Sequence, residues 1–464
     1  MNEKEIYDAI MASCSEYMGL PDMAVPAYFN FPYPQRLGGL AYLNKWHVLR
    51  SSGDIDKFLK LNDAITALPQ RQPSGEDVAH ENIIRWLQKA MKECKPKDVQ
   101  TPRKKFVLSF TVWGEEYTGK LFKYVFASLL APGNIAALCA DRYTIIHIQT
   151  NNEGAKFISE HPTTKKLCKA GANIVYEIIP DEVLKSIRTS DMLYWFVGAT
   201  ASMGLTFAKR NGAAFHWGMP DIVYSENYFK ELMRLAESHR NIVAIAPRSD
   251  EAAITPMIEP YFKKDYLAIP SGDLVAIALN GIHFSEYHGV INNRPAADAL
   301  PMSHKFIWEA QDTVYFCCPH VNPMHIHPDC LKDMPDRFFH SLDSEIDFII
   351  KGNDFYMTKA EDKMYCLEIS NQSKAPLDDR FVNVLDYGRV FWQVVAMRDT
   401  LKFFFNAQEV AINREMRPSA PLIPEKQIRN EREQLKHVIL TVDPYKGKIL
   451  ASPRLHDAMY NNAA

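Results

Sequence analysis

From about residue 105, apolar positions alternate between the spacing of strands and the spacing of helices. The run Phe106 to Val112 is rich in β-branched and aromatic residues, which predicts a buried strand. Two further apolar runs, Tyr143 to Gln149 and Asn173 to Ile179, follow after stretches with helical periodicity. This repeated order predicts an α/β fold with a mostly parallel sheet flanked by helices.

The first hundred residues show only helical spacing of apolar positions. The segment Lys95 to Lys105, KPKDVQTPRKK, is polar and broken by proline, which indicates a domain boundary. We therefore expect a helical N-terminal region over 1–100, an α/β domain over 105–370 and a helical C-terminal segment with a tail over 371–464. Within that last segment the pattern predicts a helix from Gly388 to Ala411.

The stretch Ala213 to Ser225, AAFHWGMPDIVYS, reads as a strand that stops at Pro220-Asp221. Open α/β sheets bind ligands at the carboxyl ends of their strands. Mn²⁺ and Mg²⁺ prefer oxygen ligands and are held by one or two carboxylates together with substrate phosphates. Asp221 is therefore a candidate metal ligand. The alternative is that Asp221 or Ser225 caps the next helix.

A second stretch, MHIHP, places His325 and His327 on one face of an extended segment. One imidazole would ligate a metal while the other orients it or a phosphate. His320 is the obvious third ligand if the site is a zinc site, which would indicate a hydrolase. The alternative is a pair of surface histidines.

Two further segments are suited to a nucleotide. In WGEEY, after the first strand, Gly114 would let the backbone approach a base or ribose, on which Trp113 or Tyr117 could stack. Arg248 follows a predicted strand and suits bidentate contact with a phosphate. The alternatives are that both aromatic residues belong to the core and that Arg248 forms a surface ion pair. The sequence contains neither GxGxxG nor GxxxxGK[ST].

Composition narrows the classes of function. The apolar fraction is 47%, the charged fraction is 23% and the formal net charge is −3, so no basic field suggests nucleic acid as a partner. The eight cysteines form no CxxC pair, which fits a reducing cytoplasm. No apolar run approaches the roughly 20 residues of a membrane span. We expect a cytoplasmic protein, with peripheral attachment to the inner membrane and homo-oligomers left open.

Four of these motifs together resemble the GT-A class of glycosyltransferases, and more specifically bacterial glycosyltransferase-like proteins with a helical N-terminal region. They are the strand before WGEEY, SLLAPGN (Ser128 to Asn134), MPDIVYS and HIHP. The resemblance covers about residues 105–370. It implies a nucleotide-sugar-binding domain in which Asp221 takes the acidic position and His325 or His327 completes the shell of Mn²⁺ or Mg²⁺. The acidic motif usually reads Asp-any-Asp, whereas this chain has Pro-Asp-Ile-Val.

The resemblance further implies a hexosyltransferase-like enzyme of polysaccharide biosynthesis. It would move a sugar from a nucleotide-sugar donor to a cell-surface glycan or a lipid-linked acceptor. An inverting enzyme needs a general base, for which Asp273, Glu286 and Asp312 are candidates of equal standing. Two alternatives remain, a metal-dependent hydrolase that uses His320, His325 and His327, and a non-catalytic GT-A-like binding protein.

Overall fold

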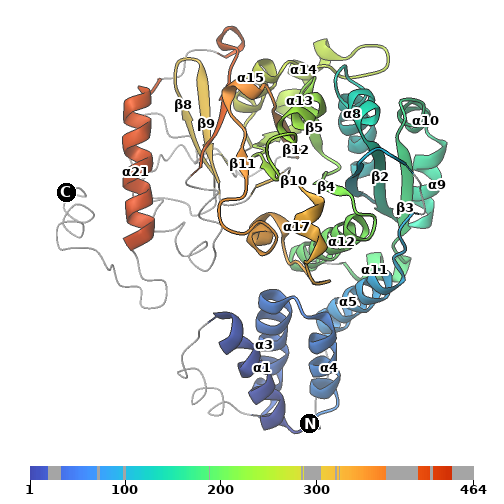
Figure 1. Cartoon of the computed structure of the whole chain (residues 1–464). Helices are drawn as coiled ribbons and strands as arrows, with labels where there is room; N and C mark the ends of the chain where they lie inside the picture. The colour runs from blue at the N-terminus through green and yellow to red at the C-terminus, as the bar shows by residue number, and fades with distance from the viewer. Residues whose placement is uncertain are drawn as a thin grey trace.

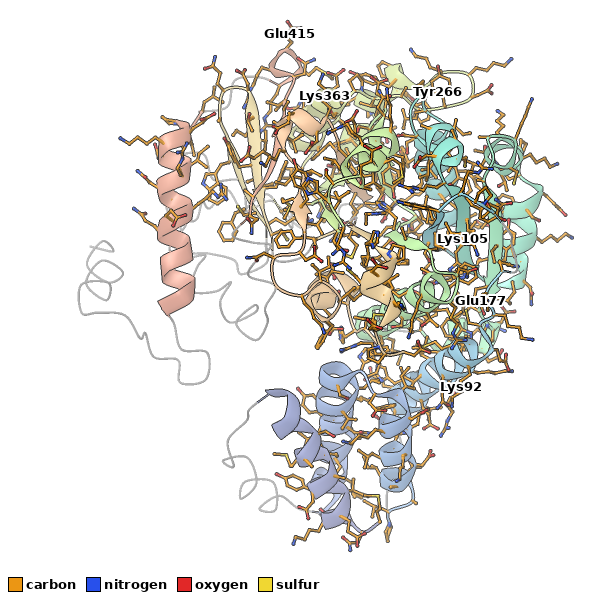
Figure 2. The ribbon with its side chains drawn as sticks, viewed as in Figure 1. Lys92, Lys105, Glu177, Tyr266, Lys363 and Glu415 are labelled. Atoms are coloured by element: carbon orange, nitrogen blue, oxygen red, sulfur yellow. The ribbon has the colours of Figure 1, made fainter. Side chains whose placement is uncertain are left out.

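The computed structural model describes residues 1–18, 33–69, 74–97, 101–187, 189–283, 286, 305–318, 321–322, 324–371, 406–417 and 422–441. Figure 1 shows the helical N-terminal region as a separate blue layer below the sheet-containing remainder of the chain. The chain passes from the first part to the second between Lys92, near the end of the last N-terminal helix, and Lys105, at the start of the first strand (Figure 2).

The N-terminal helices share one core with a helix of the α/β part. Their apolar stripes enclose buried residues such as Phe58 and Leu87, against which Phe196 of α12 also packs. Ser74 starts the last helix of the region with a capping box, in which its side chain accepts from the N–H of Asp77 and the Asp77 carboxylate accepts from the N–H of Ser74. The elements are α1 (Glu3–Met18), α3 (Tyr33–Leu43), the π-helical η2 (Asn44–Ser52), α4 (Ile55–Thr66) and α5 (Gly75–Glu93).

The central sheet has seven strands in the order β11-β6-β10-β4-β1-β2-β3. The pairs of β1 with β2 and β4, of β2 with β3 and of β6 with β11 are parallel, while β10 runs antiparallel to both β4 and β6. The strands are β1 (Lys105–Thr111), β2 (Tyr143–Thr150), β3 (Asn173–Ile178), β4 (Ala214–Trp217), β6 (Ile242–Val243), β10 (Met324–Ile326) and β11 (Tyr356–Met357).

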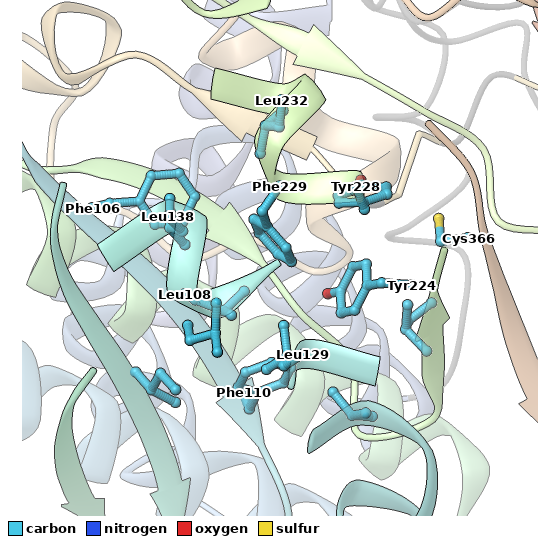
Figure 3. Close-up of a cluster of buried hydrophobic side chains, with 14 of the residues drawn as sticks. Phe106, Leu108, Phe110, Leu129, Leu138, Tyr224, Tyr228, Phe229, Leu232 and Cys366 are labelled. Atoms are coloured by element: carbon cyan, nitrogen blue, oxygen red, sulfur yellow. The ribbon is translucent and has the colours of Figure 1, made fainter. Parts of the chain in front are cut away.

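Side chains that alternate along β1 enter two different cores. Phe106, Leu108 and Phe110 pack with Leu138 and Leu232 of two helices on one face of the sheet (Figure 3). Val107 packs on the opposite face with residues of α12. The prediction of an α/β fold with a mostly parallel sheet flanked by helices is thus confirmed. The helices between the strands are α6 (Glu115–Lys120), η3 (Leu121–Phe126), α7 (Ala127–Leu129), α8 (Ile135–Asp141), α9 (Asn152–Glu160), α10 (Pro162–Lys169), α11 (Asp181–Ser186), α12 (Ser190–Arg210), α13 (Tyr228–Leu235), α14 (Glu251–Ile258), α15 (Ser271–Asn280), α17 (Pro328–Lys332) and α18 (Leu342–Glu345).

Two three-stranded sheets extend the central one. The first has the order β5-β12-β7, with β5 (Ile222–Tyr224), β12 (Cys366–Ser370) and β7 (Arg248–Asp250). The second has the order β13-β9-β8, with β13 (Gln408–Ala411), β9 (Thr313–Cys317) and β8 (Phe306–Glu309). The C-terminal helix α21 (Glu425–Thr441) lies next to β8, where the Trp308 indole N–H donates to Glu431 over 2.9 Å (Figure 1).

The prediction of a helix up to Ala411 is wrong at its C-terminal end. Gln408–Ala411 form a strand that pairs antiparallel with β9, and Val410 is buried opposite Val314. The apolar residues Val410 and Ile412 are two positions apart, which is the period of a strand. Residues 388–405 of the predicted helix lie outside the described residues. Among the helices that the structure describes, each is too short or too polar to reach across a lipid bilayer.

Candidate active site

Asp221 lies in the loop after the carboxyl end of β4, as the strand pattern predicts. Gly218 follows the strand, and its N–H continues the ladder by donating to the Ser109 carbonyl over 2.9 Å. A Cβ at Gly218 would lie 2.3 Å from the ring of Phe110, so only glycine lets the chain pass there. Two residues after Met219 the chain reaches Asp221, which is 5% exposed and whose Oδ1 has no hydrogen-bond partner.

The small sheet β5-β12-β7 brings a second carboxylate beside Asp221. The N–H of Ile369 in β12 donates to the Asp221 carbonyl over 2.8 Å, and Glu368 is paired with Ile222 across the two strands. On the other side of β12, Glu368 is paired with Arg248 of β7. Arg248 Nε lies 2.7 Å from Glu368 Oε1, and the Glu368 side chain is 12% exposed. The small sheet thus pairs Glu368 with Arg248 and brings the backbone of β12 next to that of Asp221.

The charged groups around Asp221 shift its pKa in opposite directions. Burial, and after it the charge of Glu368, raises the pKa of Asp221 to about 8, while Lys120 and Arg248 act to lower it. The Glu368 carboxylate is the main cause that raises the pKa of Arg248. An unpaired, buried carboxyl group with a raised pKa is typical of functional sites rather than of structural ion pairs.

Lys120 is the second cation near Asp221. Its Nζ lies 3.2 Å from Glu116 and 3.4 Å from Glu251, and the side chain is 5% exposed. Burial alone would lower the pKa of Lys120, but the charges of Glu251, Glu116 and Asp221 outweigh burial and raise it. The net effect raises the pKa of Lys120, which favours its charged form.

A second ion pair lies behind Arg248. Glu286 Oε2 accepts from the backbone N–H of Arg248 over 2.9 Å, and Glu286 Oε1 lies 2.6 Å from Lys305 Nζ. The N–H of His283 donates to the Arg248 carbonyl over 2.9 Å. Of the three candidate general bases, Glu286 is the one that the structure brings to this cluster.

The other two candidate bases lie elsewhere. Asp273 accepts from the hydroxyl of Tyr261 and from the amide of Asn413, both over 2.7 Å, beside a depression of about 530 Å³ that Tyr261 also lines. Asp312 is exposed in the turn between β8 and β9. Asp273 thus holds α15 to the segment after β13, and Asp312 faces solvent, so neither joins the cluster around Asp221.

Within the WGEEY segment, Tyr117 interacts with the candidate site and Trp113 packs on the core. Gly114 has a φ of 75°, and no atom lies within 4 Å of a Cβ built on it, so the position needs glycine for its backbone and has open space beside it. Tyr117 is 40% exposed, and Asp221 is among the charges that raise its pKa. Trp113 instead makes an edge contact with Phe196 at 4.9 Å, on the N-terminal core. The interpretation of Trp113 as a core residue is therefore the one that the structure supports.

The two predicted imidazole ligands belong to β10 and to the residue after it, where His325 pairs with His216 inside the sheet. β10 runs antiparallel between β4 and β6, and its His325 is 3% exposed. The ring centroid of His325 lies 5.5 Å from that of Phe106, on which it stacks. His327 accepts from the N–H of Asp329 and begins α17. The charges that act on His327 come from Asp329, Arg240, Lys104 and Arg142, of which Lys104 and Arg142 directly precede the amino ends of β1 and β2.

The structure does not bring His325 and His327 into the cluster around Asp221, because neither imidazole is among the groups that perturb the pKa of Asp221. Their role as metal ligands stays a prediction. The antiparallel direction of β10 carries the HIH segment away from the carboxyl ends of the parallel strands. His320 lies outside the described residues. Within the described parts of the chain, no group of three or more His, Cys, Asp or Glu side chains is arranged to hold a metal ion.

Sequence reasoning missed Lys120, Lys305 and Glu368. Glu368 had a detectable signal, because it is the one charged residue in the strand Cys366–Ser370. A lone carboxylate in an apolar strand requires a partner or a function. Lys120 and Lys305 had no comparable signal, since their carboxylate partners are distant in the sequence or lie in an ordinary helical turn.

Comparisons with known proteins give low similarity. No family model and no curated protein matches the chain. Among solved structures, GalNAc-T7 with UDP, GalNAc and Mn²⁺ is similar at a TM-score of 0.33 and 11% identity over 73% of this chain and 55% of that one. Mouse xyloside xylosyltransferase 1 has a TM-score of 0.26, 12% identity and coverages of 56% and 86%. Core-mannan synthase A from Aspergillus fumigatus, in its Mn/GDP form, has a TM-score of 0.27, 11% identity and coverages of 68% and 88%.

All three similar structures are glycosyltransferases by name, and none indicates the bacterial subgroup. The chain spans just over half the length of GalNAc-T7. At these identities and TM-scores the likeness assigns neither a substrate nor a residue role to this chain. The function must therefore be argued from the cluster around Asp221.

Proposed function

We propose that the chain is a glycosyltransferase that uses a nucleotide-sugar donor. The observation that carries the proposal is Asp221, a buried carboxyl group whose Oδ1 has no partner, at the carboxyl end of β4 and beside Lys120 and Arg248. This end of a parallel sheet is where α/β folds bind nucleotides. Two fixed cations and a carboxylate that suits a metal are what a sugar diphosphate requires.

A divalent cation fits the carboxylate half of the predicted ligand set. Asp221 Oδ1 is a buried oxygen without a hydrogen bond, and Mn²⁺ and Mg²⁺ take such oxygen ligands. The imidazoles of His325 and His327 fit less well, because His325 is buried in the sheet against Phe106 and His327 caps α17. When bound, the cation would neutralise charge on the leaving diphosphate.

The chain's own residues would act as follows. Arg248 and Lys120 would hold phosphate oxygens, since both are fixed by carboxylates on neighbouring elements. Gly114 leaves room for the ribose or base, next to the exposed ring of Tyr117. Glu286 is the proposed general base of an inverting reaction, and it would take the proton of the acceptor hydroxyl.

We also propose four more specific properties. They are a hexosyl donor, a cell-surface glycan or lipid-linked acceptor of polysaccharide biosynthesis, a cytoplasmic location peripheral to the inner membrane, and a homo-oligomer. A metal-dependent hydrolase is less well supported, because its imidazoles include one that is buried against Phe106 and one that begins α17. A non-catalytic binding protein differs from the proposed enzyme only in lacking turnover.

A thermal-shift panel tests the proposal. UDP, GDP, CMP and their sugars are added with and without Mn²⁺ to the full chain and to Asp221→Ala. A ligand present at a hundred times its dissociation constant stabilises the folded state by about 2.7 kcal/mol, which such a scan detects. We expect one nucleotide to raise the Tm in a Mn²⁺-dependent way that Asp221→Ala abolishes and the control Asp312→Ala retains. A panel without any shift would reject the donor site.

A further inference from the structure

The strand β3 forms one edge of the central sheet. Figure 1 shows it as the outermost strand, next to α9 and α10. Residues 174–177 of β3 are only half-buried and its two ends are exposed, whereas every residue of β2 after Tyr143 is buried. Among the described residues, β3 pairs with β2 on one side, and no strand or isolated bridge pairs with its outer side.

The register identifies the backbone groups on the outer side of β3. The N–H of Ile179 donates to the Thr150 carbonyl over 2.8 Å, so the backbone of Ile179 faces β2. Because backbone groups alternate in direction along a strand, those of Ile174, Tyr176 and Ile178 face outward. A strand edge with free N–H and C=O groups is a template on which another strand can pair.

The same three residues place apolar side chains along this edge. Ile174 and Tyr176 pack at the margin of the core that α9 and α10 cover, and Ile178 is 37% exposed. Natural sheet edges are commonly blunted by proline, by lysine or by a very short strand. The opposite edge, β11, has two residues, whereas β3 has six and contains neither proline nor lysine. The outer side of β3 is therefore an apolar edge without these protective features.

Charges of opposite sign flank the two ends of β3. Lys165 and Lys169 are exposed in α10, which precedes the strand. Asp181 and Glu182 are exposed in the first turn of α11, which follows it. A second copy of β3 that runs antiparallel to the first brings the lysines of each copy toward the acids of the other. The partner that this charge pattern fits is thus a second copy of this chain.

We infer that two copies of this chain associate by antiparallel pairing of their β3 strands. The two-fold axis passes at Tyr176, so that Ile174 of each copy is opposite Ile178 of the other. The outward backbone groups then bond to each other, and the two tyrosine rings meet as a cross-strand aromatic pair. This surface specifies the homo-oligomer proposed above, and it does not depend on the donor site, so either proposal can fail alone.

Sedimentation velocity of the full chain at several concentrations measures the association. We expect a species of twice the chain mass of 53.1 kDa. Ile178→Lys places a charge in the paired edge and should weaken the dimer about tenfold or more, because the residue occurs twice in the interface. The matched control is Leu193→Lys, since Leu193 of α12 is also apolar and also 37% exposed, and this variant should dimerise as the original chain does.

Two further variants test the edge and the direction of pairing. Ile174→Pro removes an outward N–H and keeps the ladder with β2, so it should weaken the dimer while the protein stays folded. Lys169→Glu should weaken the dimer by setting like charges against each other, and the addition of Glu182→Lys in the same protein should restore it. Circular dichroism confirms the fold of each variant.

The contrary results are distinct. A monomer at every concentration would overturn the inference, as would a dimer that both Ile178→Lys and Ile174→Pro leave intact. A dimer that Leu193→Lys weakens equally lies on another surface. A Lys169→Glu dimer that Glu182→Lys fails to restore would overturn the antiparallel arrangement. If Ile178→Lys does not fold, Ile174→Pro and the charge reversal decide the question. A monomer that still binds nucleotide would leave the proposed function standing.

Discussion

Arg248 Nε lies 2.7 Å from Glu368 Oε1, and the two residues are partners in the parallel pairing of β7 with β12. The contact uses the Nε–H of the guanidinium group, and the Arg248 side chain remains 40% exposed. The charges of Arg248 and Lys120 both act on Asp221 in the direction that lowers its pKa. This relationship is the basis of the first prediction.

Arg248→Lys should weaken nucleotide-sugar binding about tenfold while the protein stays folded. Lysine keeps the charge but cannot bond the Glu368 carboxylate and a phosphate in one plane, as a guanidinium group can. The measurement is the donor Kd by titration calorimetry. The control is Arg240→Lys, an exposed arginine that pairs with Asp354 next to the amino end of β6. Equal donor affinity in both variants would remove Arg248 from the site.

Gly114→Ala should lower both the Tm and the affinity for nucleotide. At a φ of 75° an alanine is strained even though nothing lies within 4 Å of its Cβ, and such strain costs on the order of 1–3 kcal/mol. The control Gly119→Ala lies within α6, also with nothing within 4 Å, and should leave binding unchanged. A Gly114→Ala protein with the original Tm and affinity would contradict the role given to this turn.

His325→Leu should make the protein less sensitive to acid. Burial, followed by the charges of His327 and Arg142, lowers the pKa of His325 to about 3 from an ordinary value of 6.5. Between these values the unfolded chain binds a proton that the folded chain does not, so this contribution to stability is complete above pH 6.5 and is lost as the pH falls toward 3. The neighbouring groups are the Phe106 ring, against which it stacks, and His216, its partner in β4.

Urea unfolding at pH 5 and pH 7 measures that effect. The free energy of unfolding of the original chain should fall more between pH 7 and pH 5 than that of His325→Leu. The same variant should keep the Mn²⁺ affinity of the original protein, because His325 is buried in the sheet against Phe106. A loss of Mn²⁺ binding in His325→Leu would restore the imidazole as a metal ligand.

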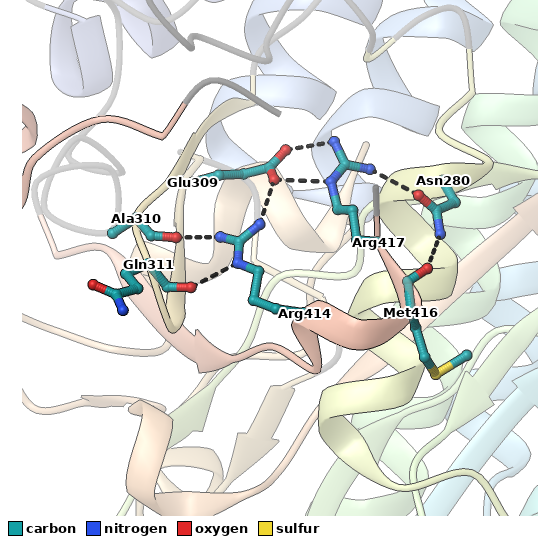
Figure 4. A network of polar contacts seen from close by, with 7 residues as sticks. All are labelled: Asn280, Glu309, Ala310, Gln311, Arg414, Met416 and Arg417. Atoms are coloured by element: carbon teal, nitrogen blue, oxygen red, sulfur yellow. Dashed lines mark hydrogen bonds and ion pairs between the residues drawn. The ribbon is translucent and has the colours of Figure 1, made fainter. Parts of the chain in front are cut away.

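Glu309→Gln should destabilise the chain by about 3–5 kcal/mol without changing metal or nucleotide binding. Glu309 is fully buried and lies between Arg414 at 3.0 Å and Arg417 at 2.5 Å, which join β8 to the segment after β13 (Figure 4). Removal of the carboxylate leaves two arginine charges facing each other. The control Glu409→Gln, half-buried in β13, should cost less than about 1 kcal/mol. A loss of less than about 1 kcal/mol in the free energy of unfolding of Glu309→Gln would show that the buried carboxylate is readily replaced.

Several parts of the candidate site were predictable from local pattern. Asp221, Gly114, Tyr117, Arg248 and Glu286 were each recognised as a polar or special residue next to a predicted strand or loop. In the structure the charge of Asp221 acts on Tyr117, that of Arg248 acts on Asp221, and Glu286 bonds the Arg248 backbone. Asp273 and Asp312 were equally good by the same criteria and lie elsewhere. Local pattern identifies residues with chemistry, but it does not state which strands become neighbours.

Strand direction decided what the sequence alone did not determine. The apolar runs and their spacing were enough for the alternation of strands and helices, since hydrophobic period follows from backbone geometry. They do not specify strand direction, and β10 enters the sheet antiparallel between β4 and β6, where His325 pairs with His216. Another long-range pairing, of β12 with β5, brings the backbone of Ile369 against Asp221, which only the folded sheet makes neighbours.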